Sequence, residues 1–530
     1  MEPTIALLLI ILPIILAFIM LVFLKKAADT TGVVVWFVTL LIAIIAFQTD
    51  PGIALLASFA GIVRSFPISL MVATSILMIT WMQETGALQR LIVFFKTLGG
   101  GSRPMQIMLI SLGLGLFLVG IGATPVSMLP PVMLALGFNP LVAVALPSIG
   151  YDPLTTFALL GVPAVVFTDV FNASAGTNIA LWEAGSVFAM YMPVITTGIA
   201  ISMLWIAGGK EMLKDREGLL LALICGVTAG GIAIVMNLQF VNLTTLTNVF
   251  AGAAVMGILF VYTRVRKRSF IDRSILDEKD LEVERNMDLK RASIPWVILV
   301  ILCLATNIII PIRDFLFVDL ALPIAIPGTA AIPTRFFWQA YTLMLISTLV
   351  AMPFFKTDKE VLSRTFKKFM SRAPRPVLAA AIFFAMAEVM VKSGYVWVGG
   401  VWTLVENSNN MIYVLATATS STIGIAYPLT AAFLGLLGGF ISGSETSAIA
   451  MFTDYHYTTS SLIGANPVVV SASNGIGGGL ASVLSPAKIQ NAAAVIDEIG
   501  IEGEVIRYGA VVAVIMTAAV AIMTMIWAFL

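Results

Sequence analysis

Four ionisable side chains stand inside otherwise apolar stretches of this 530-residue chain. Glu445 lies in FISGSETSAIAMF, Glu388 in AIFFAMAEVMVK, Asp152 in GYDPLTT and Lys488 in LSPAKIQNAAAVI. Burying an unpaired charge is costly, so ionisable residues in apolar spans usually serve function, and we expect the three acids to take part in ion coupling. Each also has a structural interpretation. Glu388 precedes Lys392 by four residues and could pair with it on one helix face. Asp152 could cap a helix, and Lys488 could reach a membrane interface.

Small polar residues surround Glu445, and Gly and Pro interrupt an earlier apolar run, GLGLFLVGIGATPVSMLPP. Continuous helices avoid Gly and Pro unless a break is wanted, and a broken backbone survives in a membrane only when it is buried in protein or lines a cavity. Half-helix N-termini at such breaks can bind an anion, although small residues can also serve close helix packing. The expected substrate-binding residues are Gly120, Thr124, Ser127, Ser442, Gly443, Ser444, Thr446, Ser447, Asn474 and Lys488.

The composition predicts an all-α polytopic membrane protein. Hydrophobic residues make up 59% of the chain and charged residues 11%, against about a quarter in soluble domains. Apolar windows at 5–24, 33–47, 187–206 and 296–310 are long or nearly long enough to span a bilayer as helices. The N-terminus lacks a basic segment and a cleavage site, so we expect a retained first helix. A net charge of +1 gives no indication of nucleic-acid binding, and two cysteines in apolar spans predict neither a disulfide nor a metal cluster.

Five basic blocks orient the helices. They lie at residues 25–26, 90–103, 210–216, 264–291 and 356–375. Placing all five in the cytoplasm requires an even number of crossings between neighbouring blocks. The apolar spans at 217–236 with 246–263, and at 294–311 with 336–355, satisfy this requirement, and the N-terminus then lies outside. The mixed-charge block at 264–291 is expected to be a linker between halves.

Two stretches resemble each other weakly. Each has a helix ending in [TS]-G, then a Gly-rich apolar run that reaches a threonine, then G-x-N-P. The charge argument makes the helix at 67–83 enter the cytoplasm and the helix at 376–395 leave it, as inverted-topology repeats do in secondary transporters. The expected organisation is an N-terminal half at 1–210 with a repeat at 67–208, connecting helices and a charged loop at 211–293, and a C-terminal half at 294–530 with a repeat at 376–530.

Two motifs of this chain resemble motifs of the L-lactate permease family. FLGLLGGFISGSETSAIAMF is similar to that family's F-L-G-x-L-G-x-F-x-[ST]-G-S-[DE]-T-S segment, and GIGGGLASVLSPAKIQNAAAVI resembles the segment that continues it. The resemblance implies proton-coupled symport of lactate or glycolate across the cytoplasmic membrane of a bacterium or archaeon. It also implies two inverted repeats with re-entrant hairpins that move as an elevator. Residues 442–447 match the second hairpin motif, and Ser485 with Pro486 matches a later S-P.

Two positions depart from the family's pattern. Val119 stands where the family's first motif, F-L-E-G, has an acid, and Lys488 stands near a position that the family fills with a small polar residue. An anion other than lactate is therefore compatible with the chain. Glu445 could take up a proton before the anion binds and release it inside, because desolvation favours a neutral carboxyl group. It could instead pair with Lys488 or cap a half-helix.

Other mechanisms and classes stay open at this point. Na⁺ coupling is the nearest alternative, with hydroxyl and carbonyl oxygens and Asn474 as ligands. A channel would need a filter motif and an enzyme would need convergent acid–base groups or a metal site. The sequence has neither, nor a P-loop. His456, in FTDYHYTTS, is expected in a loop. The expected partners are a small organic anion and the bilayer, without cofactor or nucleic acid, and a homodimer is compatible with the sequence.

Overall fold

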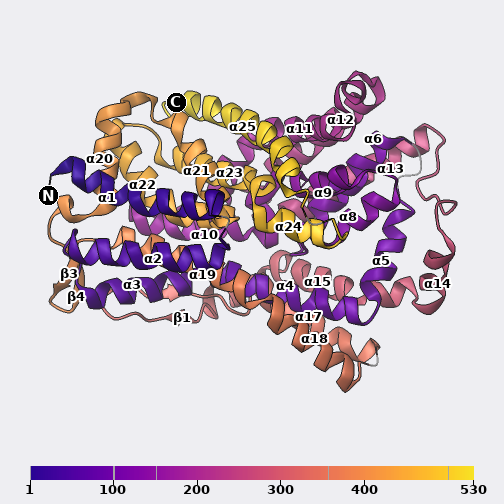
Figure 1. Ribbon diagram of the computed structural model, residues 1–530, viewed down its shortest axis with the longest axis horizontal. Coiled ribbons are helices and arrows are strands. Elements are labelled where there is room, and N and C mark those ends of the chain that lie inside the picture. The colour runs from indigo at the N-terminus through magenta and orange to yellow at the C-terminus, as the bar shows by residue number, and fades with distance from the viewer. Residues whose placement is uncertain (1, 25, 99–101, 151, 356, 499) are drawn as a thin grey trace.

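The chain folds into a helical bundle, shown in Figure 1 as a computed structural model. The structure describes residues 2–24, 26–98, 102–150, 152–355, 357–498 and 500–530. Within these residues, 11 helical segments are long and apolar enough to cross a membrane. The chain is therefore an integral multi-pass membrane protein, as its composition predicts.

In the described part of the chain, thirteen α-helices precede residue 266. They are α1 (Pro3–Phe18), α2 (Ala28–Ile45), α3 (Pro51–Arg64), α4 (Phe66–Glu84), α5 (Ala87–Lys96), α6 (Arg103–Gln106), α7 (Gly115–Gly120), α8 (Pro125–Ala135), α9 (Pro140–Ile149), α10 (Ala158–Ala175), α11 (Leu181–Lys214), α12 (Arg216–Met236) and α13 (Thr247–Val265). Shorter helical turns extend or join them: η1 (Ile19–Phe23), η2 (Ile107–Leu114), η3 (Asp152–Phe157) and η4 (Thr244–Leu246).

The remaining helices follow the charged loop. They are α14 (Glu278–Asn286), α15 (Leu289–Ile308), α16 (Ile310–Asp314), α17 (Ala340–Ala351), α18 (Lys359–Arg372), α19 (Pro374–Val391), α20 (Met411–Ile423), α21 (Pro428–Ser442), α22 (Glu445–Ile463), α23 (Pro467–Leu480), α24 (Pro486–Ala494) and α25 (Glu502–Trp527). The turns here are η5 (Phe315–Asp319), η6 (Met352–Phe355), η7 (Asn407–Asn409), η8 (Gly424–Ala426) and η9 (Ser482–Leu484). Two short antiparallel hairpins pair β1 (Pro323–Ile324) with β2 (Ile332–Pro333) and β3 (Tyr395–Val398) with β4 (Val401–Leu404).

Capping side chains and proline set where several of these helices begin. The Asp50 carboxylate accepts the N–H of Gly52 at the start of α3 (2.8 Å), and Asn139 accepts that of Val142 in α9 (2.9 Å). Asn466 caps α23 in the same way. A proline follows each of these three caps, where its missing N–H costs nothing. The G-x-N-P stretches of the sequence are thus helix starts.

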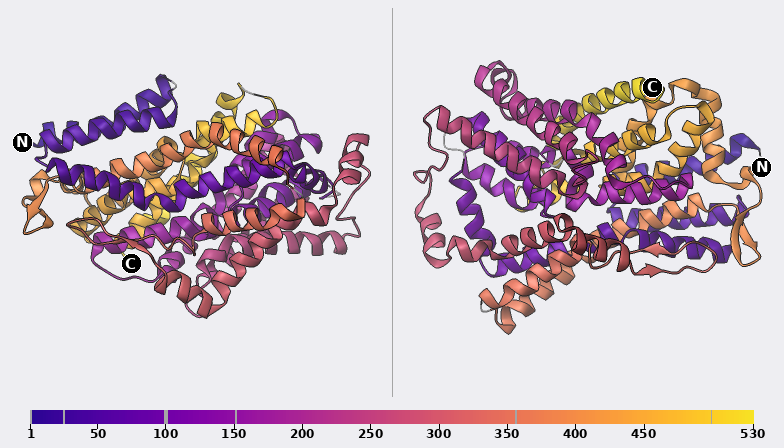
Figure 2. Two further views of the ribbon diagram at one scale, coloured as in Figure 1. Left: turned by 90° about the horizontal axis from the view of Figure 1, so that it is seen from below. Right: turned by 180° about the vertical axis from the view of Figure 1, so that it is seen from behind.

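Helices from the two halves of the chain interleave. Helix α19 packs against both α2 and α3, and α10 packs against α22. The turned views in Figure 2 show segments of the second half running beside the N-terminal helices. A core of buried side chains from both halves is continuous through most of the bundle. Residues more than 250 positions apart can therefore meet in one site.

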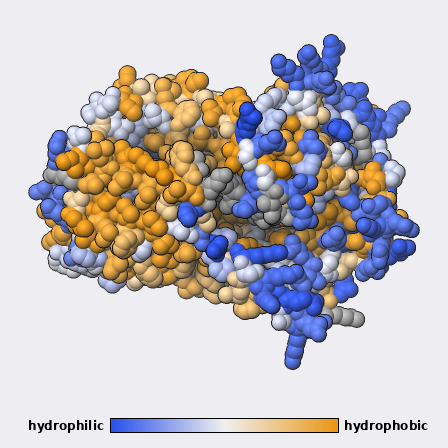
Figure 3. All heavy atoms as spheres, in the orientation of Figure 1, coloured by the Kyte–Doolittle hydropathy of each residue, from blue (hydrophilic) through white to orange (hydrophobic). Residues whose placement is uncertain are grey.

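The surface divides into apolar and hydrophilic regions. Figure 3 shows apolar side chains gathered on the part that carries the N-terminal helices, and hydrophilic ones at the end that carries α14 and α18. On the apolar part, Leu8 is 66% exposed and Ile45 is 76% exposed. Such exposure is unfavourable in water and normal against lipid tails.

Ion pairs link the basic blocks at the hydrophilic end. They are Arg375–Asp29 at 3.5 Å, Lys96–Asp280 at 2.8 Å, Arg90–Glu284 at 2.9 Å, Arg268–Glu217 at 2.6 Å and Lys368–Glu84 at 2.5 Å. Asp29 closely follows the first block, and Glu217 directly follows the third. The 264–291 segment is docked against α5 through these pairs. Its helix α14 is capped by Asp277, whose carboxyl group accepts the backbone N–H of Asp280; this hydrogen bond lowers the pKa of the Asp277 carboxyl group.

Candidate functional site

The tip between α21 and α22 is a tight turn fixed by glycine and serine. Gly443 has φ of 70°, a left-handed conformation that L side chains rarely adopt, and a Cβ there would lie 2.9 Å from Ser485 Oγ. Ser442 donates to the carbonyl oxygens of Gly438 (2.8 Å) and Ser444 (3.1 Å). Ser444 is the N-cap of α22. Ser442 and Ser444 of the S-G-S-E-T-S motif therefore satisfy backbone groups in this structure.

Glu445, the first residue of α22, is buried at 2% exposure. Its Oε1 accepts a hydrogen bond of 2.6 Å from the hydroxyl of Thr156 in η3, which is 289 residues away in the chain. Its Oε2 lies against Gly479 of α23, where a Cβ would be only 2.6 Å from this oxygen. The carboxyl group is thus enclosed between the two halves of the protein. Ser444, not Glu445, caps the helix, so that structural alternative is wrong.

Asp152 and Lys488 lie beside Glu445. Asp152 begins η3, is 4% exposed, and its carboxyl group faces Lys488, the hydroxyl of Ser482 and the backbone N–H of Val483. Lys488 donates to Ser482 Oγ at 3.0 Å and interacts electrostatically with both acids. Two carboxyl groups, one ammonium group and a set of hydroxyls therefore form one polar cluster inside the bundle.

The backbone is strained next to this cluster. Leu159 and Leu160, three and four residues after Thr156, have φ of 56° and 58°. A left-handed conformation costs an L residue roughly 1–2 kcal/mol. Such strain persists only where the surrounding structure imposes it, and it gathers at functional sites. Here it redirects the chain from η3 into α10, and so positions Asp152 and Thr156.

The tip of the first hairpin, between α7 and α8, packs against α13 and α4, away from the polar cluster. A Cβ at Gly120 would lie 2.8 Å from the backbone N of Val249 in α13, and one at Gly122 would lie 2.2 Å from Cε of Met71 in α4. Thr124 precedes α8 as its N-cap residue. The side chain of Ser127 lies outside the described part of the structure. Helix α24, which carries Lys488, packs against α8 and α9, so it joins the first hairpin to the polar cluster.

Other predicted site residues are buried near the second hairpin. Thr446 and Ser447 are each 1% exposed, and the backbone N–H of Ser447 donates to Ser444 Oγ at 3.4 Å. Asn474, in α23, is fully buried and donates to the carbonyl oxygen of Ala448 at 3.2 Å. The hydrogen bond from Asn474 holds α23 against α22.

Two expectations are wrong. Glu388 pairs with Arg64 at 3.3 Å instead of with Lys392, which lies over the ring of Tyr395. Arg64 ends α3 and lies close enough to compete, whereas Lys392 follows the last turn of α19. His456 is not in a loop: it lies within α22, is 0% exposed, and is hydrogen-bonded to the Tyr427 hydroxyl at 2.5 Å. Helix α22 runs from Glu445 to Ile463 and includes the whole FTDYHYTTS stretch, which contains no glycine or proline that would end it.

Four residues of the cluster were missed from sequence: Thr155, Thr156, Gly479 and Ser482. A Cβ at Gly479 would lie 3.1 Å from Cβ of Thr155, so this threonine also borders the cluster. The signal was present in the sequence as hydroxyl side chains three to six residues from Asp152 or Lys488. Within the described residues, no group of three His, Cys, Asp or Glu side chains could hold a metal ion, and both cysteines are free and buried.

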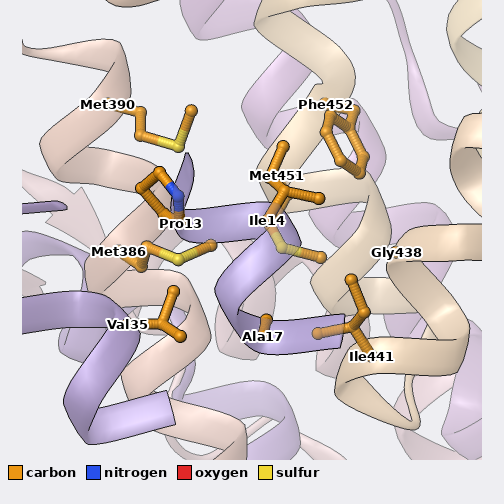
Figure 4. A pocket seen from close by; sticks show the side chains of 10 residues that line it. All are labelled: Pro13, Ile14, Ala17, Val35, Met386, Met390, Gly438, Ile441, Met451 and Phe452. Carbon is orange, nitrogen blue, oxygen red and sulfur yellow. The ribbon is translucent and has the colours of Figure 1, made fainter. Parts of the chain in front are cut away.

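A small pocket near the second hairpin is apolar. Figure 4 shows it between α1, α2, α19 and the α21–α22 hairpin, with Met386, Met390 and Met451 among the side chains that line it. All ten lining residues are apolar. It therefore offers no polar group to an anion, and it is separate from the polar cluster.

Comparisons with known proteins agree on one family. The family model for L-lactate permease matches residues 6–530. The glycolate permease GlcA of Escherichia coli (strain K12) is 23% identical over 556 residues, which cover 98% of this chain and 95% of the relative. The L-lactate permease of Bacillus subtilis (strain 168) is 23% identical over 545 residues, with 94% and 91% covered, and that of Salmonella typhi is 23% identical over 461 residues, with 80% and 78% covered. Membership in such a family implies a transporter and not an enzyme. The chain belongs to the L-lactate permease family.

Proposed function

We propose that this protein is a secondary active transporter that carries a small organic anion, such as lactate or glycolate, together with protons. The observation that carries the proposal is the cluster formed by the buried carboxyl groups of Asp152 and Glu445 and the half-buried Lys488, with the hydroxyls of Thr156 and Ser482. An ammonium group and hydroxyls suit the carboxylate and hydroxyl of a 2-hydroxy acid. Relatives named as L-lactate and glycolate permeases support this substrate class.

Charge balance within the cluster gives a reason for proton coupling. If Lys488 is charged, the buried cluster is neutral only when one of its two carboxyl groups holds a proton. An incoming anion adds one negative charge, and a buried net charge is costly. A second proton on the other carboxyl group restores neutrality. One of the two carboxyl groups, of Asp152 or Glu445, would then take up this second proton when substrate binds and release it when substrate leaves.

The arrangement of helices supports inverted repeats. In the N-terminal half Gly86, with φ of 77°, follows α4. In the C-terminal half Gly394, with φ of 76°, follows α19. In each half a hairpin is then followed by a capping asparagine, Asn139 or Asn466, that begins a helix ending near a short 3₁₀ turn, η3 or η9. The two turns hold Asp152 and Ser482, which meet in the cluster. We propose that the two hairpins with these turns form a moving unit, as in an elevator mechanism.

Na⁺ coupling is the second candidate, and the cluster itself argues against it. Lys488 lies beside both carboxyl groups, and its positive charge opposes binding of a cation there. The basic end of the bundle would face the cytoplasm of a bacterial cell, by the distribution of Lys and Arg. The N-terminus would lie outside the inner membrane.

Uptake by purified protein in proteoliposomes tests the proposal. Labelled lactate and glycolate are offered under a pH gradient and, separately, under a Na⁺ gradient, to the parent and to Glu445→Gln. We expect uptake driven by the pH gradient in the parent. Glu445→Gln should lose this uptake but retain counterflow exchange, because exchange needs no net proton release. Uptake driven by the Na⁺ gradient alone, or no uptake of either anion, would overturn the proposal.

A further inference from the structure

Helix α18 joins two apolar helical segments. It follows η6 and precedes α19, and both neighbouring apolar segments, Ala340–Phe355 and Pro374–Val391, are suited to the membrane. Asp358 caps it by accepting the backbone N–H of Val361 at 2.7 Å. Figure 1 shows α18 projecting from the bundle at the hydrophilic end. A helix between two membrane segments at such a place is close to lipid headgroups.

One face of α18 is fixed to the protein. Arg364 and Lys368 both bind Glu84 at the end of α4, at 3.0 and 2.5 Å. Thr365 on the same side is 2% exposed. Arg372 donates to the side chain of Gln83 at 3.1 Å. These contacts set the rotation of the helix about its axis.

The opposite face presents an apolar stripe. Leu362, Phe366 and Met370 follow one another at intervals of four residues, so they lie on one face of the helix. They are 41%, 61% and 50% exposed. An apolar stripe on a helix of otherwise basic and polar residues is typical of helices that lie in a membrane interface.

Charge favours an anionic partner for this face. Residues 356–375 contain seven Lys and Arg and two acids. Lys359 and Lys367 lie on the helix surface beside the stripe, and within the described residues no salt bridge involves either of them. Basic residues near a bilayer surface bind anionic lipids, each with about fivefold gain in affinity.

We propose that α18 is an interfacial helix that binds anionic phospholipid in the leaflet facing the basic end of the bundle. The stripe formed by Leu362, Phe366 and Met370 inserts among the upper acyl chains, and Lys359 and Lys367 bind the headgroup phosphates. The contacts with Glu84 hold the helix in this orientation. The inference concerns the surface of the protein and is independent of the substrate and of the driving ion.

Site-directed fluorescence on the full-length protein tests it. Cysteines at Phe366→Cys, in the stripe, and Ser371→Cys, on the exposed side away from the stripe, each receive an environment-sensitive label. The native Cys225 and Cys303 are 0% and 1% exposed and should remain unlabelled, which the parent protein checks. The proteins are placed in nanodiscs of phosphatidylcholine with phosphatidylglycerol, and an acyl-chain quencher is carried by one lipid or the other.

We expect strong quenching at position 366 and weak quenching at position 371. Quenching at 366 should be severalfold stronger when phosphatidylglycerol carries the quencher, and Lys359→Gln with Lys367→Gln should abolish this preference. High salt should reduce the preference as well, without moving the label out of the bilayer. Equal quenching from both lipids would overturn the role of anionic lipid. A label at 366 that is in water, or that is shielded from lipid by protein such as a second copy of the chain, would overturn the proposal entirely.

Discussion

Replacing Gly479 by alanine should disable the polar cluster while leaving the fold largely intact. A Cβ at this position would lie 2.6 Å from Oε2 of Glu445, which is closer than real Cβ contacts allow, and 3.1 Å from Cβ of Thr155. Glu445 must then move, because Gly479 is held in α23. Overpacking costs roughly 1–3 kcal/mol, while alanine in place of glycine gains about 1 kcal/mol in a helix. The net loss of stability is therefore about 0–2 kcal/mol.

The effect on transport should be larger than the effect on stability. A displaced Glu445 loses its 2.6 Å hydrogen bond with Thr156. A hydrogen bond to a charged group contributes about 1.5–3 kcal/mol, which corresponds to roughly a tenfold to hundredfold loss of rate. Uptake driven by a pH gradient, measured beside thermal unfolding in detergent, checks both values.

The matched control is Gly231→Ala in α12, where a Cβ meets no atom within 4 Å. It should transport normally and unfold at the same or a slightly higher temperature. Normal uptake by Gly479→Ala would refute the reasoning, because Glu445 would then not need its present position. A large loss of folded Gly479→Ala protein would also refute the reasoning, because it would show that the glycine is required for packing and not for the site.

Three further predictions concern other contacts. Thr156→Val, which keeps the side-chain shape but removes the donor to Glu445, should lower proton-driven uptake about tenfold, and Thr156→Ser should restore most of it; equal uptake by all three proteins would contradict this. Gly477→Ala should reduce the yield of folded protein on size-exclusion chromatography, because its Cβ would lie 1.9 Å from the backbone oxygen of Ala432, which cannot yield as a side chain can. Lys96→Met and Asp280→Asn, combined in a double-mutant cycle of thermal unfolding, should couple by about 1 kcal/mol, and additive effects would show that the pair does not anchor α14.

The sequence predicted the class of fold because that prediction depends on local properties. Length and hydropathy of single segments suffice to identify helices such as α4 and α12, and the structure has both within one residue of the expected ranges. The asparagine of each G-x-N-P stretch proved to be a helix cap, which is also a local property. Gly120 and Pro125 likewise mark the break between α7 and α8, but Pro130 and Pro131, which were also expected to interrupt the run, lie inside α8.

Pairings between distant elements were harder to predict. Asp152, Glu445 and Lys488 were each chosen from their apolar surroundings, but nothing in the sequence indicated that η3 meets the tip of α22. The partner of Glu388 was missed for the same reason, since a helix periodicity argument can name Lys392 but cannot name Arg64, more than 300 residues away. Thr156 was missed because a threonine in an apolar stretch attracts notice only when its acceptor is known.

The glycines of α21 and α23 have a mechanical consequence. At Gly435, Gly439 and Gly477 the two helices approach so closely that an added Cβ would fall within 1.9–2.2 Å of a backbone oxygen. Backbone atoms in such contact cannot slide past one another, so the hairpin and α23 behave as one stiff body. On the other side of the hairpin, methionines line a loosely filled gap (Figure 4), and unbranched thioether side chains change rotamer at little cost. If the hairpin moves relative to α1 and α19, the methionine side chains in this gap would therefore rearrange. The contacts around Glu445 would move with the hairpin and keep their geometry.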